Sequence, residues 1–392
     1  MMTLRALNKE LFDTIRMDYR NLHSIPEIHD ELPLTRQYIL DQLDEFDLNI
    51  REDVGNHGIV ATLSGEEKGG CIGWRADMDA LPMEEKTQLP FRSRHTGAMH
   101  ACGHDAHVAI ALGIIRILDK HRHLIRGHVK FLFQPAEEST GGAEHMINDK
   151  ALKEPSVDRI LGLHVWPSLE KGQVGLAKKE LMAGGLTLKF HIQGKGGHAG
   201  RPHDSVNPIV VAAKLVDEIE SIKNYMVPSH ENLVITMGML QSGSVFNVIP
   251  DEAIMHGTVR YFNWDLKEVV VELIRQICRS LDEMLGSHTI LEVIENYPPT
   301  NNDEQVIEEI DQIIDSFEDY ESVDIKIPSM GSEDFSFFLN EVPGSFVWLG
   351  MRQKDTSDYF EIHHPKFTVN EQIFLDSPAL FSQIIIEMLQ SL

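Results

Sequence analysis

Met99-His100-Ala101-Cys102-Gly103-His104-Asp105-Ala106-His107 is the segment around which the rest of the sequence can be interpreted. It holds three histidines, a cysteine and an aspartate within nine residues, and it continues into the apolar run Val108–Leu112. Thiolate, imidazole and carboxylate groups on one short loop form the ligand set of a first-row metal, most naturally zinc. The alternative is a polar loop that caps a helix, with His104 or Asp105 near the cap. Polar clusters elsewhere in the chain favour the metal site.

Composition indicates a globular protein with a strong acidic excess. Of the 392 residues, 42% are hydrophobic and 24% are charged, and the formal net charge is −26 at pH 7. Phosphate contacts need clustered lysine and arginine, so this balance argues against binding to nucleic acid or to an anionic membrane. No apolar run approaches about 18 residues, which argues against a transmembrane span. Three cysteines at unrelated spacings (Cys71, Cys102 and Cys278) form no disulfide framework, and with no signal peptide evident at the N-terminus we expect a cytoplasmic protein.

Strands and helices alternate over the first 180 residues. Polar clusters follow the apolar strands directly: Arg75–Pro82 after one, Gln134–Glu138 after the next, and His164 after a third. Strand, polar cluster and helix in repetition indicate an α/β sheet with a site at the carboxyl ends of its strands. The strands are expected at 58–63, 71–74, 129–133 and 160–163, and the helices at 8–22, 33–46, 105–119 and 141–149.

The hydrophobic pattern changes near residue 180. Leu186–Ile192 alternates strictly between apolar and polar side chains, as does part of Ile254–Val259, which indicates strands with one solvent-exposed face. Long amphipathic helices at 206–224 and 266–284 accompany these strands. We therefore predict an inserted two-layer α+β domain with the order strand-helix-strand-strand-helix-strand. The predicted domains are 1–180 with 293–392, which resumes with helices near 303–317 and 371–390 and a strand at 346–349, and the insertion 181–292.

Glu137 and Glu138 are adjacent carboxylates. Neighbouring side chains of a strand point to opposite faces, so these two share a site only if the strand has ended. Pro135 before them and Gly141-Gly142 after them indicate that it has. One carboxylate can then bind a metal while the other accepts a proton from metal-bound water, whose pKa a cation lowers toward about 7. Two solvent-exposed glutamates are the alternative.

Four other positions in this domain carry weaker signals. His164 follows an apolar strand, where a single histidine is more often a hydrogen-bonded core residue than a ligand. His363-His364-Pro365 is a histidine doublet in a loop. Asp77 and Asp79 are two residues apart and could orient ligand histidines, or could form a turn before Leu81-Pro82.

The predicted insertion holds three further candidates. His198 lies in the glycine-rich turn Gly194–Gly200, whose spacing fits neither a dinucleotide fingerprint nor a phosphate-binding loop, so a hairpin tip is the simpler interpretation. Asn247 and Arg260 flank a strand and could bind an anionic group, or could only cap and pair.

Taken together and in chain order, these segments resemble the di-zinc aminoacylase/carboxypeptidase family of metallopeptidases, in its amidohydrolase branch. That branch includes hippurate hydrolases, N-acetyl-amino-acid deacetylases and auxin-conjugate hydrolases. The similarity covers nearly the whole chain. The segments that carry it are Leu22-His23-x-x-Pro26-Glu27, Arg75–Pro82, His100–Asp105, Gln134–Glu138, Gly197-His198-Ala199, Asn247–Asp251, Gly331–Phe335 and His363-His364-Pro365.

The resemblance implies a mixed-sheet, metallopeptidase-type catalytic domain with an inserted two-layer α+β lid and dimerisation domain. It also implies a homodimer formed through the insertion, with tetramers as a further step, and two divalent metals per subunit. The metal ligands that it implies are Cys102, His104, Glu138, His164 and His363. Glu137 would be the general base and acid. His198 would hold the scissile carbonyl oxygen in another subunit's site, and Asn247 and Arg260 would contact the substrate carboxylate.

One departure from the wider peptidase family concerns the metal ligands. The family's first His-x-Asp appears here as Asp77-Met78-Asp79, and its bridging aspartate appears as Cys102, as in the amidohydrolase branch. Asp79 is therefore counted with the catalytic residues. Thiolate and imidazole suit zinc, while the carboxylates leave room for manganese, cobalt or nickel.

The implied function is hydrolysis of the amide bond of small N-acetyl or N-benzoyl amino acids. Metal-bound hydroxide would attack, and Glu137 would carry the proton to the leaving amine. Three alternatives remain. The first is a metallo-dipeptidase or carboxypeptidase on the same fold, and the second is a metal-free mechanism with Cys102 as a nucleophile activated by His104. The third is a non-enzymatic metal-binding protein, in which Glu137 and Glu138 have no role.

Overall fold

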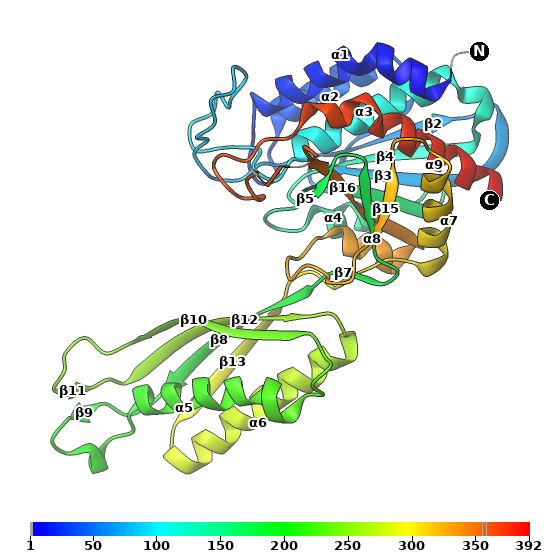
Figure 1. Ribbon diagram of the computed structural model, residues 1–392. Helices are drawn as coiled ribbons and strands as arrows, with labels where there is room; N and C mark the ends of the chain where they lie inside the picture. The colour runs from blue at the N-terminus through cyan, green and yellow to red at the C-terminus, as the bar shows by residue number, and fades with distance from the viewer. Residues whose placement is uncertain (1–2, 355, 358) are drawn as a thin grey trace. The chain divides into compact units, whose positions relative to one another are not determined.

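The computed structural model describes residues 3–354, 356–357 and 359–392, and it divides into two compact units (Figure 1). Unit 2 consists of Met182–Thr300 and Pro328–Glu333, and the rest of the chain forms unit 1. Unit 2 contains nearly all of the predicted insertion 181–292 and extends beyond it to Thr300. It also includes Pro328–Glu333, where Ser329 O accepts a hydrogen bond from Ala183 N at 2.9 Å. Among the described residues, no helix has the length and apolar character needed to cross a membrane.

Unit 1 is built on an eight-stranded mixed sheet in the order β1-β2-β4-β3-β5-β16-β6-β15. Its central strands β4, β3, β5 and β16 are parallel, so their carboxyl ends meet at one edge of the sheet. This confirms the predicted mixed α/β class. The strands are β1 (Asn49–Val54), β2 (Gly58–Ser64), β3 (Glu67–Asp77), β4 (Arg126–Gln134), β5 (Arg159–Glu170), β6 (Gln173–Leu176), β15 (Glu321–Asp324) and β16 (Gly344–Arg352).

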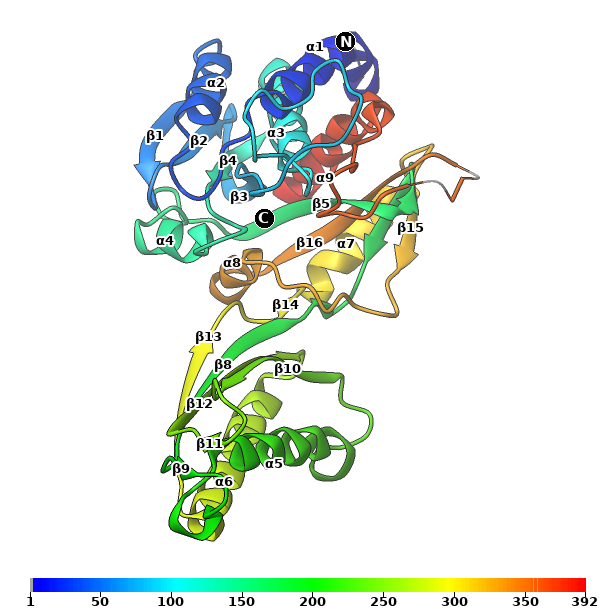
Figure 2. The same ribbon diagram turned by 90° about the vertical axis from the view of Figure 1, so that its left-hand side faces the viewer.

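Helices cover both faces of this sheet. Figures 1 and 2 show α3 and α9 against one face, with α1 outside them, and α4 and α8 against the other. Short 3₁₀ turns at Arg122–Leu124 and Glu371–Leu375 complete the unit. The helices are α1 (Leu4–His23), α2 (Pro33–Leu43), α3 (His104–Lys120), α4 (Gly142–Asn148), α7 (Glu304–Asp315), α8 (Phe335–Glu341) and α9 (Ser377–Ser391).

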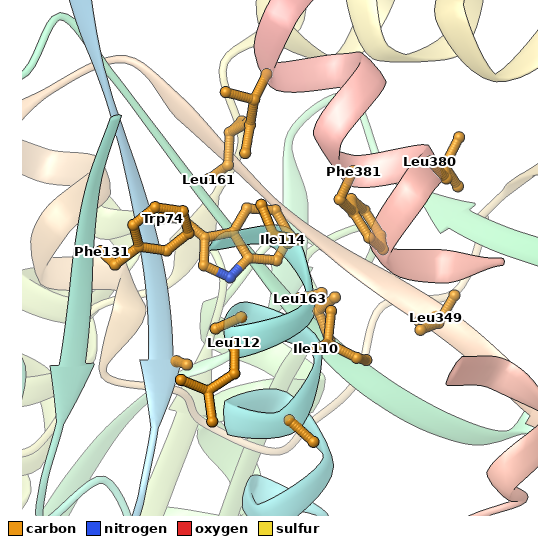
Figure 3. Packing of buried hydrophobic residues seen from close by; sticks show 14 of the residues in the cluster. Trp74, Ile110, Leu112, Ile114, Phe131, Leu161, Leu163, Leu349, Leu380 and Phe381 are labelled. Carbon is orange, nitrogen blue, oxygen red and sulfur yellow. The ribbon is translucent and has the colours of Figure 1, made fainter. Parts of the chain in front are cut away.

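The core of unit 1 lies where α3 and α9 pack on the central strands. Residues 104–118 of α3 are all buried: most are apolar, and the polar ones, such as His104, Asp105 and Arg116, have buried ionic or hydrogen-bond partners. Figure 3 shows Trp74 of β3 among Ile114 of α3, Phe131 of β4 and Phe381 of α9. The rings of Trp74 and Phe381 lie 5.0 Å apart between centroids. The metal loop, residues Met99–Gly103, is therefore followed by a helix that core packing holds in place.

Two predicted elements differ from the observed ones. The strand expected to end at Leu163 continues to Glu170, so His164 lies inside β5 and pairs with Trp348 of β16. The helix expected over 371–390 begins only at Ser377, after a 3₁₀ turn, with Pro378 in its first turn. Proline lacks the N–H that an interior helical position needs, which explains why the longer helix does not form.

Unit 2 is a two-layer unit with a four-stranded antiparallel sheet in the order β10-β12-β8-β13. One face packs on α5 and α6, and alternate residues of β8 are buried on that face, as the period-2 pattern predicted. Two short strands, β7 (Glu180–Met182) and β14 (Thr300–Asn301), include two of the four points where the chain passes between the units. The other elements are β8 (Gly184–Gln193), β9 (Gly197–His198), η2 (Pro202–Asp204), α5 (Pro208–Ser221), η3 (Ile222–Met226), β10 (Leu233–Ser242), β11 (Val248–Ile249), β12 (Glu252–Tyr261), α6 (Trp264–Leu285) and β13 (His288–Glu295).

Candidate metal centre

The loop before α3 and the middle of β5 bring three ligand side chains together. Cys102 Sγ lies 3.3 Å from His164 Nε2, and both residues are buried. The ligand atoms of Cys102, His104 and His164 all lie within 4.8 Å of one another. Gly103 makes this approach possible: its φ is +94°, and a Cβ there would lie 2.4 Å from a methyl group of Val165.

Hydrogen bonds to main-chain carbonyls determine which ring nitrogen faces the centre. His104 Nδ1 lies 2.8 Å from Asp79 O, and His164 Nδ1 lies 2.8 Å from Val165 O. A carbonyl only accepts, so in each neutral ring Nδ1 carries the proton and Nε2 presents its lone pair. Both histidines are therefore held in the form that binds a metal through Nε2.

Glu137 and Glu138 lie on a turn that begins where β4 ends, as Pro135 predicted. Asp79 holds this turn: its two carboxylate oxygens accept hydrogen bonds from Glu137 N and Glu138 N, each at 3.0 Å. Ala136 has a φ of +60°, which turns the chain out of the strand direction. Ligand atoms of His104, Glu137 and Glu138 also lie within 4.8 Å of one another.

The two histidines of the doublet make different contacts: His363 lies against Glu138, and His364 lies against Phe360. His363 Nε2 lies 3.0 Å from Glu138 Oε1, and its backbone N–H donates to Ala101 O at 2.7 Å. His364 instead stacks on Phe360, with ring centroids 4.4 Å apart. Cys102, Glu138 and His363 form a third group of candidate ligand atoms within 4.8 Å. Cys102 therefore belongs to two ligand groups, one with the buried histidines and one with Glu138.

The electrostatics of the centre favour a cation. Burial alone would lower the pKa of His104, but Asp77 and Asp79 raise it to about 10. Burial and the neighbouring Glu138 and Glu137 raise the pKa of the Cys102 thiol well above its ordinary value. His104 Nε2 is buried and has no hydrogen-bond partner within the described residues. Carboxylates that stabilise positive charge on this ring would also stabilise a divalent cation bound at its free Nε2, so the residues present fit a metal.

His107 lies beside the centre, and both of its ring nitrogens contact other groups. Its Nδ1 lies 2.6 Å from Asp77 Oδ1, and its Nε2 accepts a hydrogen bond from Val165 N at 3.0 Å. Both ring nitrogens are occupied, so only two of the three histidines on the loop offer a free lone pair. Burial alone would raise the pKa of Asp77, but Arg75, His104 and His107 hold it well below its ordinary value.

A buried network beside the centre was not predictable as a whole from the sequence. Arg75, the last residue but two of β3, is fully buried and donates to Asp77, Gln134 and Asp334. An arginine directly after an apolar strand is a usable signal, because a buried guanidinium requires anionic partners. The identity of those partners is not readable from local sequence.

Behind the metal loop, His23 bridges two carboxylates. Its Nδ1 lies 2.6 Å from Asp105 Oδ2, and its Nε2 lies 3.4 Å from Glu85 Oε1. Burial alone would lower the pKa of His23, but hydrogen bonds with Asp105 and Glu85 raise it to about 9. The charged ring links the end of α1 to the start of α3.

This link predicts a pH-dependent stability. Because the folded pKa of His23 exceeds the ordinary 6.5, its contribution is complete below about pH 6.5 and is lost as pH rises through 9. We expect the free energy of unfolding to fall more steeply between pH 7 and 9.5 in the wild type than in His23→Gln, by about 3 kcal/mol at most. Urea unfolding at constant metal concentration measures this difference, and parallel curves for the two proteins would contradict it.

His198, Asn247 and Arg260 belong to unit 2. Gly200 N–H donates to His198 Nδ1 at 2.9 Å, so in the neutral ring the exposed His198 carries its proton on Nε2. Asn247 O accepts from Ala199 N at 3.2 Å, which keeps Asn247 next to the His198 turn. Arg260 is half-buried beside Gly185 and donates to Ser332 Oγ, and burial lowers the pKa of its guanidinium.

Comparisons with known proteins identify the family. The model of peptidase family M20/M25/M40 matches residues 73–387. The chain belongs to this family. It is 35% identical to the N-acetyl-L-cysteine deacetylase of Bacillus subtilis, over 94% of this chain and 85% of that protein. It is 34% identical to the N-acetyldiaminopimelate deacetylase of Streptococcus pneumoniae, over 93% of this chain and 96% of that protein.

Solved structures agree with this assignment. The YXEP protein of Bacillus subtilis, described as a dinuclear metal-binding peptidase of the M20 family, matches with a TM-score of 0.86 and 30% identity, over 98% of this chain and 100% of that one. A protein of methicillin-resistant Staphylococcus aureus matches with a TM-score of 0.94 and 30% identity, covering 98% and 99% of the two chains. The predicted family is confirmed, and this member of it is a hydrolase of the amidohydrolase type. Its ligand groups and family support binding of divalent metal.

Proposed function

We propose that this protein hydrolyses the amide bond of small N-acyl amino acids, with N-acetyl compounds as the preferred class. The observation that carries the proposal is the placement of Cys102 in two ligand groups at once, with Glu137 on the turn beside them. The relatives named above act on N-acetyl amino acids, which supports the acetyl group as the acyl part.

We propose two divalent metals per chain, with Cys102 shared between them. His104 and His164 would complete one ligand set, and Glu138 and His363 the other. A thiolate and three imidazoles suit zinc, while the carboxylate leaves manganese possible and cobalt or nickel as substitutes. All three cysteines of the chain are free, and a thiolate ligand must stay reduced, which supports a cytoplasmic location.

The metals would supply a Lewis acid for the scissile carbonyl and for water. Glu137 takes the proton of the attacking water and delivers it to the leaving amine nitrogen. Its position suits this role because its backbone N–H donates to Asp79 Oδ1, which fixes the main chain that carries the carboxylate. His198 of a second subunit would donate from Nε2 to the carbonyl oxygen as negative charge develops there.

Unit 2 would bind the substrate carboxylate and join two chains. Arg260 and Asn247 supply a guanidinium and an amide suited to a carboxylate. β10 is an edge strand of its sheet, and it exposes Leu240. An exposed apolar edge can pair with the same strand of a second chain, which supports a homodimer with unit 2 as its lid and interface.

Removal and replacement of metal tests the function. We expect chelator-stripped protein to lose its activity and to recover it with added zinc or manganese, because Cys102 and the other proposed ligands then regain their cations. The measurement is amine release from a panel of N-acetyl amino acids, N-benzoyl amino acids and dipeptides. Metal-restored cleavage of dipeptides only would assign the protein to the peptidases instead. Activity that survives complete metal removal would contradict the proposal.

A further inference from the structure

We infer that Asp334 positions the turn that carries Glu137 and Glu138, and so acts on the reaction without touching the reacting atoms. The inference rests on the proposed function, because it assigns Asp334 a role in the reaction proposed for Glu137. Asp334 is fully buried and lies at the N-cap position of α8. Aspartate commonly caps helices, yet within the described part of the chain this side chain makes no cap bond. Its carboxylate instead accepts hydrogen bonds from Arg75, Gln134 and Ala143.

One oxygen of Asp334 holds both ends of the glutamate turn. Asp334 Oδ2 accepts from Gln134 Nε2 at 2.7 Å and from Ala143 N at 3.0 Å. Gln134 is the last residue of β4, and Ala143 lies in the first turn of α4. The two ends approach closely, since a Cβ on Gly142 would lie 1.9 Å from Pro135 O. Asp334 therefore closes the base of a turn whose tip carries the two glutamates.

The tip of the same turn is held by a second carboxylate. Asp79 accepts the N–H groups of Glu137 and Glu138, and its own main-chain oxygen holds His104. Because Asp334 binds the two ends of the turn and Asp79 binds its tip, the backbone of Glu137 and Glu138 has little freedom. Displacement of a reacting group by about 1 Å can cost about 100-fold in rate, so loosening the base should be visible in turnover.

Arg75 connects this base to the metal loop. It donates to Asp334 Oδ1 at 2.7 Å and to Asp77 Oδ2 at 2.5 Å, with Nε on Gln134 Oε1 at 2.9 Å. Asp77 in turn holds His107, which accepts from the strand that carries His164. The Arg75 guanidinium thus pairs with both Asp77 and Asp334. Removing the charge of Asp334 therefore also alters the surroundings of the guanidinium that binds Asp77.

A buried ion pair could be purely structural, and the chain offers a matched control. Asp18 and Arg116 are also buried and pair through Asp18 Oδ2 and Arg116 Nη1 at 2.5 Å, with Tyr38 donating to Asp18 Oδ1 at 2.7 Å. This pair links α1 to α3 and contacts none of the proposed ligands. Asp18→Asn removes a comparable buried charge without altering the glutamate turn.

The test compares Asp334→Asn, Gln134→Glu and the double variant. The asparagine amide turns N–H groups toward Gln134 Nε2 and Ala143 N, where only an acceptor fits. Glutamate at 134 restores the lost charge and accepts from both Arg75 and the new amide. Gln134→Glu alone places a second carboxylate beside that of Asp334, and the two negative charges repel each other. If Asp334 positions the turn, the double variant should therefore have a higher kcat than Gln134→Glu.

We expect Asp334→Asn to lower kcat about 10- to 100-fold while KM changes less than about threefold. The double variant should recover about tenfold in kcat over Gln134→Glu, and Asp18→Asn should stay within about twofold of wild type although its Tm falls. Cobalt(II) added alone gives a readout independent of turnover. Its visible absorption bands should shift in Asp334→Asn and not in Asp18→Asn.

Equal kcat losses and equal cobalt spectra in Asp334→Asn and Asp18→Asn would overturn the inference, as would a double variant no better than Gln134→Glu. If Asp334→Asn does not fold, the comparison of Gln134→Glu with the double variant still decides. If the wild type hydrolyses no amide, the proposed function fails, and the cobalt spectra alone then decide whether Asp334 positions the centre.

Discussion

Glu137→Gln is expected to lower kcat by about 10³-fold while the metal content per chain stays unchanged. The amide has the shape of the carboxylate but cannot accept the proton of the attacking water, so about 4 kcal/mol of transition-state stabilisation is lost. The turn should persist, because Asp79 binds the main-chain N–H of residue 137 and not its side chain. Steady-state kinetics with an N-acetyl amino acid and metal analysis of the same sample measure both quantities.

Glu138→Gln is the matched control for this prediction. Glu138 lies against His363 and belongs to a ligand group with Cys102, so its amide should weaken metal binding as well as activity. The two neighbours would then differ in metal content although both lose turnover. A Glu137→Gln variant that retained a tenth of the wild-type kcat would remove Glu137 from its proposed role.

Substitution of Cys102 is expected to have the second-largest effect. Cys102→Ser replaces the thiolate that we propose to be shared by a neutral hydroxyl, and both candidate ligand groups then lose a member. Metal affinity should fall by more than the 10- to 100-fold typical of groups that only orient ligands. Cys102→Asp restores an anionic donor at a position where the wider family carries a bridging aspartate. We expect it to regain metal and a measurable part of the activity, as determined by metal titration and amine release.

The same pair of variants separates the metal mechanism from a thiol mechanism. If Cys102 were a nucleophile activated by His104, neither serine nor aspartate would alter metal content, and aspartate would restore nothing. The protein environment already argues against that mechanism, because burial and the glutamates raise the pKa of the thiol well above its ordinary value. A nucleophilic cysteine requires the opposite shift.

The sequence was most informative where chemistry is local. The end of the strand before Glu137 was readable from Pro135 and the following glycines, because proline and glycine constrain the chain at their own positions. The mixed α/β class and the strand and helix order of unit 2 followed from hydrophobic period. His164 was harder: its strand continues to Glu170, and a histidine inside a strand is distinguished from a core residue only by its neighbour Cys102.

Long-range pairing was beyond local inference. Arg75 and Asp334 are 259 residues apart, and no spacing rule connects them. Likewise His104 and His107 lie on one helix face, and only the N–H of Val165 shows that His107 is already occupied. For His198, Asn247 and Arg260 of unit 2 the local sequence left the role open, and only the resemblance assigned one, since polar side chains of these types are common outside functional sites.

Unit 1 is assembled from three separate parts of the chain, and this has a consequence for biosynthesis. Cys102 leaves the ribosome long before His363, and at about 5–20 residues per second the interval is roughly 10–50 s. During that time α9, which packs against Trp74, has not yet been made. A nascent chain therefore exposes a ligand thiol before it can enclose a cation. By this order of synthesis, the proposed ligand set becomes complete only once His363 has been made.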